Sequence, residues 1–342
     1  MPEQTNSGAI RRSTSMPEKT KSGAIRIGAK PGQIGLAFAA VYILWGSTYL
    51  GIRIGVETIP PFLLAGLRHL TAGTLMYTWL RSRGAERPTR VHWRSAAIVG
   101  GLMLLGGNGL VTWAERRVPS GLAALIVASV PLWMTLIHAL QRRERPHGVV
   151  LVGLALGLAG IVLLVAPGSI GGAGHVDPIG AIALLSAALF WAIGSLHSRR
   201  ASLPSSIFLA TSIEMIAGGT LLLLASAVTK EWAGFSLAAV SLRSVLALGY
   251  LIVAGSLLGF TAYIFLLGAT TPARVSTYAY VNPVVAVLLG WAVAGEALTV
   301  RTMAAAAVIV ASVAVIIRHG SSRRIPAAEE NLAPLRAQGG RR

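Results

Sequence analysis

The chain has 342 residues, of which 54% are hydrophobic and 12% charged, and its mean hydropathy is +0.67. Soluble domains carry about 25% charged residues, and runs of about 20 apolar residues recur along this chain. We therefore expect a polytopic helical membrane protein embedded in a lipid bilayer. The lack of cysteine excludes disulfides and thiol catalysis. The net charge of +18 would suit a nucleic-acid partner unless its distribution has another cause.

Polar, basic tails flank the apolar part of the chain. Residues 1–33 have no buried face and predict a disordered cytoplasmic tail, in which the segment 1–11 recurs at 16–26 with nine of eleven positions identical. Met16 is therefore an alternative start. Residues 319–342 form a second basic tail, also expected in the cytoplasm.

Between the tails, hydropathy predicts ten transmembrane helices joined by short connections. They are expected near 34–53, 61–80, 95–114, 121–140, 148–166, 179–198, 207–228, 245–268, 276–295 and 300–318.

The distribution of lysine and arginine predicts the orientation of these helices. If the N-terminus lies in the cytoplasm, the cytoplasmic segments hold 23 of these residues and the external loops 5, while Arg53 and Arg68 lie within spans. Positive charge is retained on the cytoplasmic side of a membrane. Both termini are therefore expected in the cytoplasm, and the charge is explained by topology, with no nucleic-acid partner.

The ten predicted helices fall into two similar halves, 34–166 and 179–318. A shift of 146 residues aligns Trp45 with Trp191, and it aligns FLLAGLRHLTAGTL with FLATSIEMIAGGTL. Thirteen positions separate Pro131 from Glu144, and thirteen separate Pro283 from Glu296. Because each half has an odd number of helices, the second enters the membrane from the opposite side. The expected fold is thus all-α, with two inverted five-helix repeats, as in many secondary transporters.

Several strings resemble a known family. YILWGSTYLGIRIG (42–55), PPFLLAGLRHLTAG (60–73), GNGLVTWAERRVPSGLAALIVASVPL (107–132) and STYAYVNPVVAVLLG (276–290) are similar to the EamA-type drug/metabolite transporter superfamily. The resemblance covers about 34–318. It implies a ten-helix drug/metabolite transporter fold in the bacterial cytoplasmic membrane, with both termini cytoplasmic, that exports small molecules. It implies no particular substrate, because that family carries amino acids, metabolites and toxic compounds.

Three charged residues within or at the end of predicted spans are candidates for coupling or gating, since charge in a membrane is costly. Glu214 could bind and release a proton, or pair with Arg68. Arg68, which matches an arginine common in the resembled family, could instead bind an anionic substrate. Glu115 could face the cavity or be a solvated helix end. Glu144 and Glu296, by contrast, are expected to stabilise helix ends.

A substrate cavity is expected near the kinked helices. Pro131 and Pro283 interrupt helices at matching places in the two halves, which marks the substrate site in inverted-repeat transporters. Aromatic and amide side chains near these kinks and in the symmetry-related spans could line the cavity. These candidates are Trp45, Asn108, Trp113, Trp191, Tyr263, Tyr278 and Asn282.

The sequence thus predicts a secondary transporter that exports small metabolites, amino-acid-like or drug-like compounds by alternating access, with or without proton coupling. An importer or exchanger of the same fold is the alternative, and a non-transporting scaffold or channel belongs to a different class. No catalytic motif, phosphate-binding loop or metal-ligand pattern is present, so we expect neither an enzyme nor a cofactor. Small residues in the fifth and tenth spans predict close packing within the chain or in a homodimer.

Overall fold

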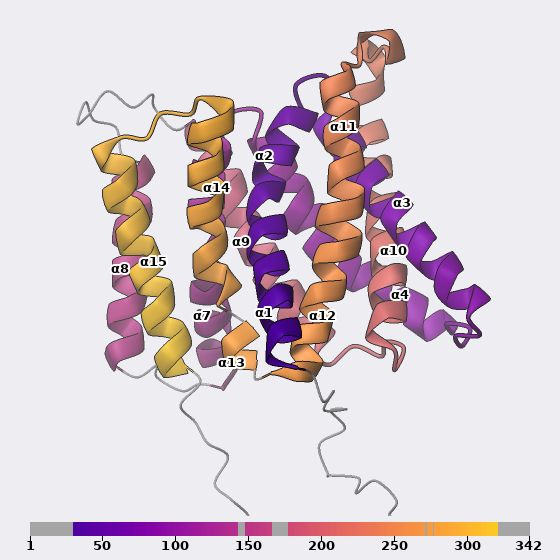
Figure 1. Cartoon of the computed structure of the whole chain (residues 1–342), viewed down its shortest axis with the longest axis horizontal. Coiled ribbons are helices and arrows are strands. Elements are labelled where there is room, and N and C mark those ends of the chain that lie inside the picture. Colours follow the sequence, from indigo (N-terminus) through magenta and orange to yellow (C-terminus); the bar gives the residue numbers. More distant parts are fainter. Residues whose placement is uncertain (1–29, 143–147, 166–176, 271, 276, 321–342) are drawn as a thin grey trace, which may run out of the picture.

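The computed structural model describes residues 30–142, 148–165, 177–270, 272–275 and 277–320, and every regular element in these ranges is a helix (Figure 1). The elements η1, η2 and η5 are π-helical, and η3 and η4 are 3₁₀ turns. In chain order the elements are α1 (Pro31–Ala40), η1 (Val41–Trp45), α2 (Gly46–Gly55), α3 (Pro61–Ser82), α4 (Arg90–Gly100), η2 (Gly101–Gly109), α5 (Leu110–Ala114), α6 (Ser120–Val127), α7 (Val130–Arg142), α8 (Gly148–Val165), α9 (Pro178–Ser198), α10 (Ile207–Val228), η3 (Glu231–Gly234), η4 (Leu237–Ala239), α11 (Leu242–Tyr250), η5 (Leu251–Leu258), α12 (Gly259–Ala269), α13 (Pro272–Val275), α14 (Tyr278–Ala294) and α15 (Val300–Gly320).

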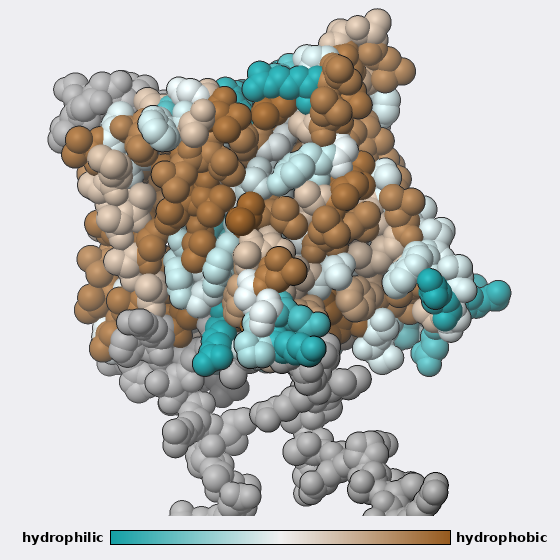
Figure 2. Space-filling view, viewed as in Figure 1, coloured by the Kyte–Doolittle hydropathy of each residue, from teal (hydrophilic) through white to brown (hydrophobic). Residues whose placement is uncertain are grey.

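Among the described residues, seven helical segments are long and apolar enough to cross a membrane, and one of them consists of α6 and α7 together. Gly148–Leu164 and Tyr278–Ala294 are shorter apolar helices. Helix α3 coincides with the predicted span 61–80 but falls outside this apolar set, and it carries Arg68, His69 and Arg81. Figure 2 shows apolar side chains over most of the visible face, with hydrophilic residues gathered toward the two ends. A surface of this kind is expected to face lipid rather than water.

Local chemistry explains where several helices begin. Pro61 and Pro178 occupy the first positions of α3 and α9, where a missing amide hydrogen costs nothing. Asp177 precedes α9, and its Oδ1 accepts a hydrogen bond from the Gly180 amide at 2.7 Å. That amide, together with the Arg117 guanidinium, lowers the pKa of Asp177 below its usual value. Such caps satisfy amides that have no partner inside the helix.

Pro131 and Pro283 occupy different positions in their helices. The predicted kink at Pro131 is a complete break, because α6 ends at Val127 and α7 starts at Val130. Pro131 therefore occupies the second position of a new helix. Pro283 lies inside α14, as expected. The π-helical segments in the first, third and eighth predicted spans were not predicted.

Most of the close packing joins the N-terminal half of the chain to the C-terminal half. Helix α3 packs along α10, and α8 packs along α15. Helix α9 contacts η2, and α1 contacts α12. Helix α14 contacts both α2 and α6, and α7 contacts α9. The small residues predicted to mediate packing in the fifth span do so inside the chain, since a Cβ at Gly160 would lie 2.7 Å from Cγ1 of Ile309 on α15. The small residues Ala307 and Ala311 of the tenth span, in α15, are instead exposed and do not pack inside the chain.

The two ends of the bundle differ. Helix α1 begins and α15 ends at the lower end in Figure 1, whereas α2 ends and α15 begins at the upper end. Two carboxylates at the upper end cap helices that are distant in sequence. Glu231 accepts hydrogen bonds from the Phe62 and Leu63 amides of α3, at 3.2 and 3.0 Å. Glu296 accepts them from the Ser120 and Gly121 amides of α6, at 2.6 and 2.9 Å. These contacts tie the upper end together.

Candidate functional site

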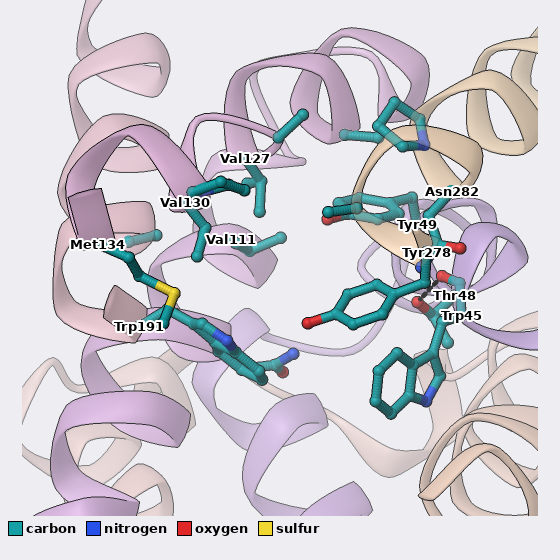
Figure 3. Close-up of a pocket in the computed structure, with 18 of the residues that line it drawn as sticks. Trp45, Thr48, Tyr49, Val111, Val127, Val130, Met134, Trp191, Tyr278 and Asn282 are labelled. Carbon is teal, nitrogen blue, oxygen red and sulfur yellow. Dashed lines mark hydrogen bonds between the residues drawn. The ribbon is translucent and has the colours of Figure 1, made fainter. Parts of the chain in front are cut away.

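A cavity of about 520 Å³ lies inside the bundle. Figure 3 shows its two walls: Trp45, Tyr49, Tyr278 and Asn282 on one side, and Trp191 with Met134 and several valines on the other. The volume is in the range of small-molecule sites, which span about 300–1,000 Å³. Helices from both halves of the chain therefore enclose space for one organic molecule.

Aromatic side chains build the first wall around Trp45. Its ring meets Tyr278 edge-on at 5.2 Å between centroids and Phe260 at 5.4 Å. Its Nε1 donates a hydrogen bond to the Gly255 carbonyl at 3.1 Å. Gly259 leaves room for the indole, because a Cβ there would lie 2.4 Å from Nε1. Hydrogen bonding and edge contacts thus fix the orientation of this wall.

Polar side chains with unused hydrogen-bonding capacity also line the cavity. Arg68 is 5% exposed, and its Nε donates to Ser256 Oγ at 2.9 Å while its Nη1 has no partner. Asn282 is buried, and its Oδ1 has no partner. His69 Nε2 and Asn108 Oδ1 are 3.1 Å apart. Buried polar atoms without partners are costly, so Arg68 and Asn282 are suited to hold a ligand.

Within the described parts of the chain, the charged residues that line the cavity are all positive. Its lining includes the arginines Arg68 and Arg199 and the histidines His69 and His138, but no aspartate or glutamate among the described residues. Arg199 is exposed and belongs to the connection from α9 to α10, which lies at the lower end of the bundle in Figure 1. The cavity therefore extends from the buried Arg68 to the lower surface.

Glu115 is a buried carboxylate that does not line the cavity. It has no exposed surface, and neither carboxylate oxygen accepts a hydrogen bond. Its charge interacts with those of Arg53, Arg68 and Glu296, and its backbone carbonyl accepts a hydrogen bond from Arg53 Nη1. The alternative that Glu115 is a solvated helix end is excluded by this burial.

Three other predicted site residues do not reach the cavity. Trp113 lies under the Arg117 guanidinium, 5.0 Å from ring centroid to Cζ. Tyr263 stands behind the wall, where it packs on Trp45 at 5.1 Å between centroids. Glu214 on α10 is partly buried and makes no ion pair with Arg68 in the described structure. Glu296 caps α6, and Glu144 lies outside the described residues.

Sequence reasoning missed several residues of the lining. Tyr49 lies one helical turn after Trp45, so the spacing of four residues could have placed it on the same face. No pattern distinguishes the cavity-facing Met134, Phe260 or Arg199 from other residues of their helices. Their orientation depends on how the helices pack.

The helices define an integral membrane protein that encloses an internal cavity. The EamA-like transporter family model matches residues 33–166 and 178–318. The chain therefore belongs to the EamA-like transporter family, and it is a transporter of the cytoplasmic membrane.

Three relatives illustrate the range of similarity. The uncharacterized inner membrane transporter YedA of Escherichia coli K12 is 44% identical over 282 residues, covering 82% of this chain and 89% of YedA. The transporter YvbV of Bacillus subtilis is 24% identical, covering 82% of this chain and 90% of YvbV. A probable amino-acid metabolite efflux pump of E. coli is 28% identical, covering 73% of this chain and 83% of the pump.

A solved crystal structure shares the fold. It superimposes with a TM-score of 0.58 at 22% identity, covering 84% of this chain and 98% of the other. The sequence identity is low, so this similarity concerns the fold alone.

Proposed function

We propose that this transporter is a secondary exporter that moves small molecules through the cavity by alternating access. The observation that carries the proposal is a cavity that is lined by unpaired buried polar groups and also by an exposed residue, Arg199. At the lower end it includes the exposed Arg199, whereas Glu231 and Glu296 tie the upper end together. The lysine and arginine distribution predicts that the lower end faces the cytoplasm. The cavity would then load from the cytoplasm.

Two inverted five-helix repeats are part of this proposal, and the packing supports them. Under the repeat, α3 corresponds to α10 and α8 to α15, and each packs on its own counterpart. Helix α14 corresponds to α6 and α7, and it likewise contacts α6. The contact of α9 with η2 corresponds to that of α1 with α12. Helices next to a two-fold axis contact their own copies, and the substrate site of such folds lies between the repeats.

Export through the cavity is tested by narrowing it. Val130 points into the cavity in Figure 3, and a Val130→Trp substitution should fill much of the space. Cells that produce the wild-type protein should accumulate one class of compound outside the cell, measured by mass spectrometry of the medium. We expect Val130→Trp to lower this accumulation at least tenfold. A matched Val152→Trp substitution on the lipid-facing side of α8, where Val152 is 58% exposed, should leave it unchanged.

Export by Val130→Trp at the wild-type rate, with both proteins present in equal amounts, would contradict the proposed route. If no compound in a broad panel accumulates, the export direction itself loses its support, and exchange or import through the same cavity becomes the better account.

Proton coupling through Glu214 is proposed as a separate feature. Glu214 lies a third of the way along α10, partly buried and without a hydrogen bond or ion pair in the described structure. A carboxylate in this setting can exchange a proton with its surroundings. We expect Glu214→Gln to abolish transport driven by a pH gradient while it retains substrate exchange at equal pH. Unchanged acceleration by a pH gradient in proteoliposomes would remove Glu214 from the coupling mechanism.

A further inference from the structure

We propose that the cavity selects organic anions, specifically small carboxylates with an aromatic or apolar body, and that Arg68 binds the carboxylate. This inference rests on the proposed function only in taking the cavity as the transport site. It names the chemical class of the substrate, which neither the fold nor the family determines.

The guanidinium of Arg68 is held by its neighbours in an orientation that suits the binding of an anion. Its Nε is fixed by the hydrogen bond to Ser256, and Gly255 allows the close approach of Nη2, since a Cβ there would lie 3.0 Å away. The remaining nitrogen, Nη1, is buried and has no partner. A guanidinium presents its donors in a rigid plane that matches a carboxylate. A ligand carboxylate would supply the missing acceptor.

No carboxylate within the described parts of the chain takes that place. Glu115 is the acidic residue whose charge acts on Arg68, but it does not line the cavity and makes no ion pair with Arg68 in the described structure. Glu214 makes none either. Arg68 therefore lines the cavity without an ion pair in the described structure, while Glu115, whose charge acts on it, lies outside the lining.

The charges of the lining disfavour other ligand classes. A cation would meet Arg68 and Arg199 with no acidic side chain to offset them. The ammonium group of an amino acid would likewise find no carboxylate in the described lining. Aromatic rings can attract cations, so the positively charged ligand has to be tested directly. The charge pattern favours an anion without an ammonium group.

The remainder of the lining fits an aromatic or apolar body. Trp45 and Tyr278 lie on one wall and Trp191 lies on the opposite one (Figure 3). The buried Oδ1 of Asn282, which has no partner, could accept one hydrogen bond from a hydroxyl or N–H group of the ligand. Sites of this kind combine an apolar wall with a few polar groups that fix orientation.

Four ligands with the same phenyl body test the charge preference. Isothermal titration calorimetry of the full-length purified protein would compare 3-phenylpropionate, its neutral amide 3-phenylpropanamide, the cation 3-phenylpropylamine and the zwitterion phenylalanine. We expect 3-phenylpropionate to bind at least tenfold more tightly than each of the other three. Equal or tighter binding of the amine, the amide or phenylalanine would overturn the proposal.

Substitutions at Arg68 test the residue. Arg68→Gln should weaken binding of 3-phenylpropionate at least tenfold, and Arg68→Lys should give an intermediate loss because it keeps the charge without the planar fork. Arg83→Gln, which alters an arginine that stacks on Trp79 away from the cavity, is the control and should bind normally. If Arg68→Gln does not fold, Arg68→Lys decides. Wild-type affinity in either folded Arg68 variant would overturn the assignment.

Binding and transport fail independently in this design. If 3-phenylpropionate binds through Arg68 but proteoliposomes exchange no solute, the anion site stands and the transport proposal falls. If proteoliposomes exchange 3-phenylpropylamine saturably and do not bind the anion, the transport proposal stands and the anion site is wrong.

Discussion

Replacing Gly219 with leucine should prevent the protein from folding. A Cβ at position 219 on α10 would lie 2.5 Å from the backbone nitrogen of Leu70 and 2.9 Å from its Cα on α3. Backbone atoms cannot move aside as a side chain can, so α3 and α10 would have to separate. Since α3 carries Arg68, the same separation would dismantle the cavity.

The measurement is the yield of monodisperse protein in detergent and its melting temperature, followed by tryptophan fluorescence. The Cβ of alanine already makes this contact, so Gly219→Ala should lose at least about 1–3 kcal/mol, the usual cost of overpacking, whereas the larger side chain of Gly219→Leu should give no monodisperse protein. Gly249 is the matched control, because it is also helical but has nothing within 4 Å of an added Cβ. A wild-type yield and melting temperature for Gly219→Leu would show that α3 and α10 do not pack as described.

Replacing Glu296 with alanine should lower the free energy of unfolding by about 2–4 kcal/mol. Its carboxylate accepts hydrogen bonds from the Ser120 and Gly121 amides and from the Ser120 hydroxyl, the last at 2.7 Å. Hydrogen bonds to charged groups contribute about 1.5–3 kcal/mol each, and the sum is reduced because Glu296 is only partly buried. The contact joins the segment after α14 to the start of α6 at the upper end.

The matched control for Glu296→Ala is Glu86→Ala, which removes an exposed carboxylate near the lower end of α3. Glu296→Gln keeps one acceptor oxygen and should lose less stability than alanine. Equal melting temperatures for Glu296→Ala and Glu86→Ala would mean that the cap does not hold the upper end together.

The positions of the helices were predictable from the sequence because bilayer thickness sets their length. Helices α9 and α10, for example, begin and end within a residue of the predicted 179–198 and 207–228. The fold of the kinked fourth span was partly predictable: the region of the interruption was correct, but the helix breaks two residues before Pro131 instead of bending at it. Local sequence did not distinguish a bend from a break.

The cavity was less predictable because helix orientation depends on tertiary packing. Trp45, Trp191, Asn108, Tyr278 and Asn282 line the cavity. Trp113 and Tyr263 have the same chemistry but lie on faces that point elsewhere. The π-helical segments add to this difficulty. Their number of residues per turn differs from that of an α-helix, so a helical wheel drawn from the sequence places the following side chains on the wrong face.

Glu296 illustrates a further limit. The sequence indicated that it stabilises the positive end of a helix, and the structure has it doing so. The helix is not the following α15 but α6, whose capped residues lie 175 and 176 positions away in the sequence. A motif can indicate the kind of interaction that a carboxylate makes, but only the packed structure supplies its partner.

The central claim is that the cavity carries solute by alternating access, and counterflow in proteoliposomes tests it most directly. Vesicles containing the purified protein would be loaded with the compound that the export comparison identifies, and uptake of the labelled compound would be measured together with membrane current. We predict saturable exchange that Val130→Trp abolishes and Val152→Trp preserves. An ohmic current without saturation, or exchange that is unaffected by Val130→Trp, would contradict the account.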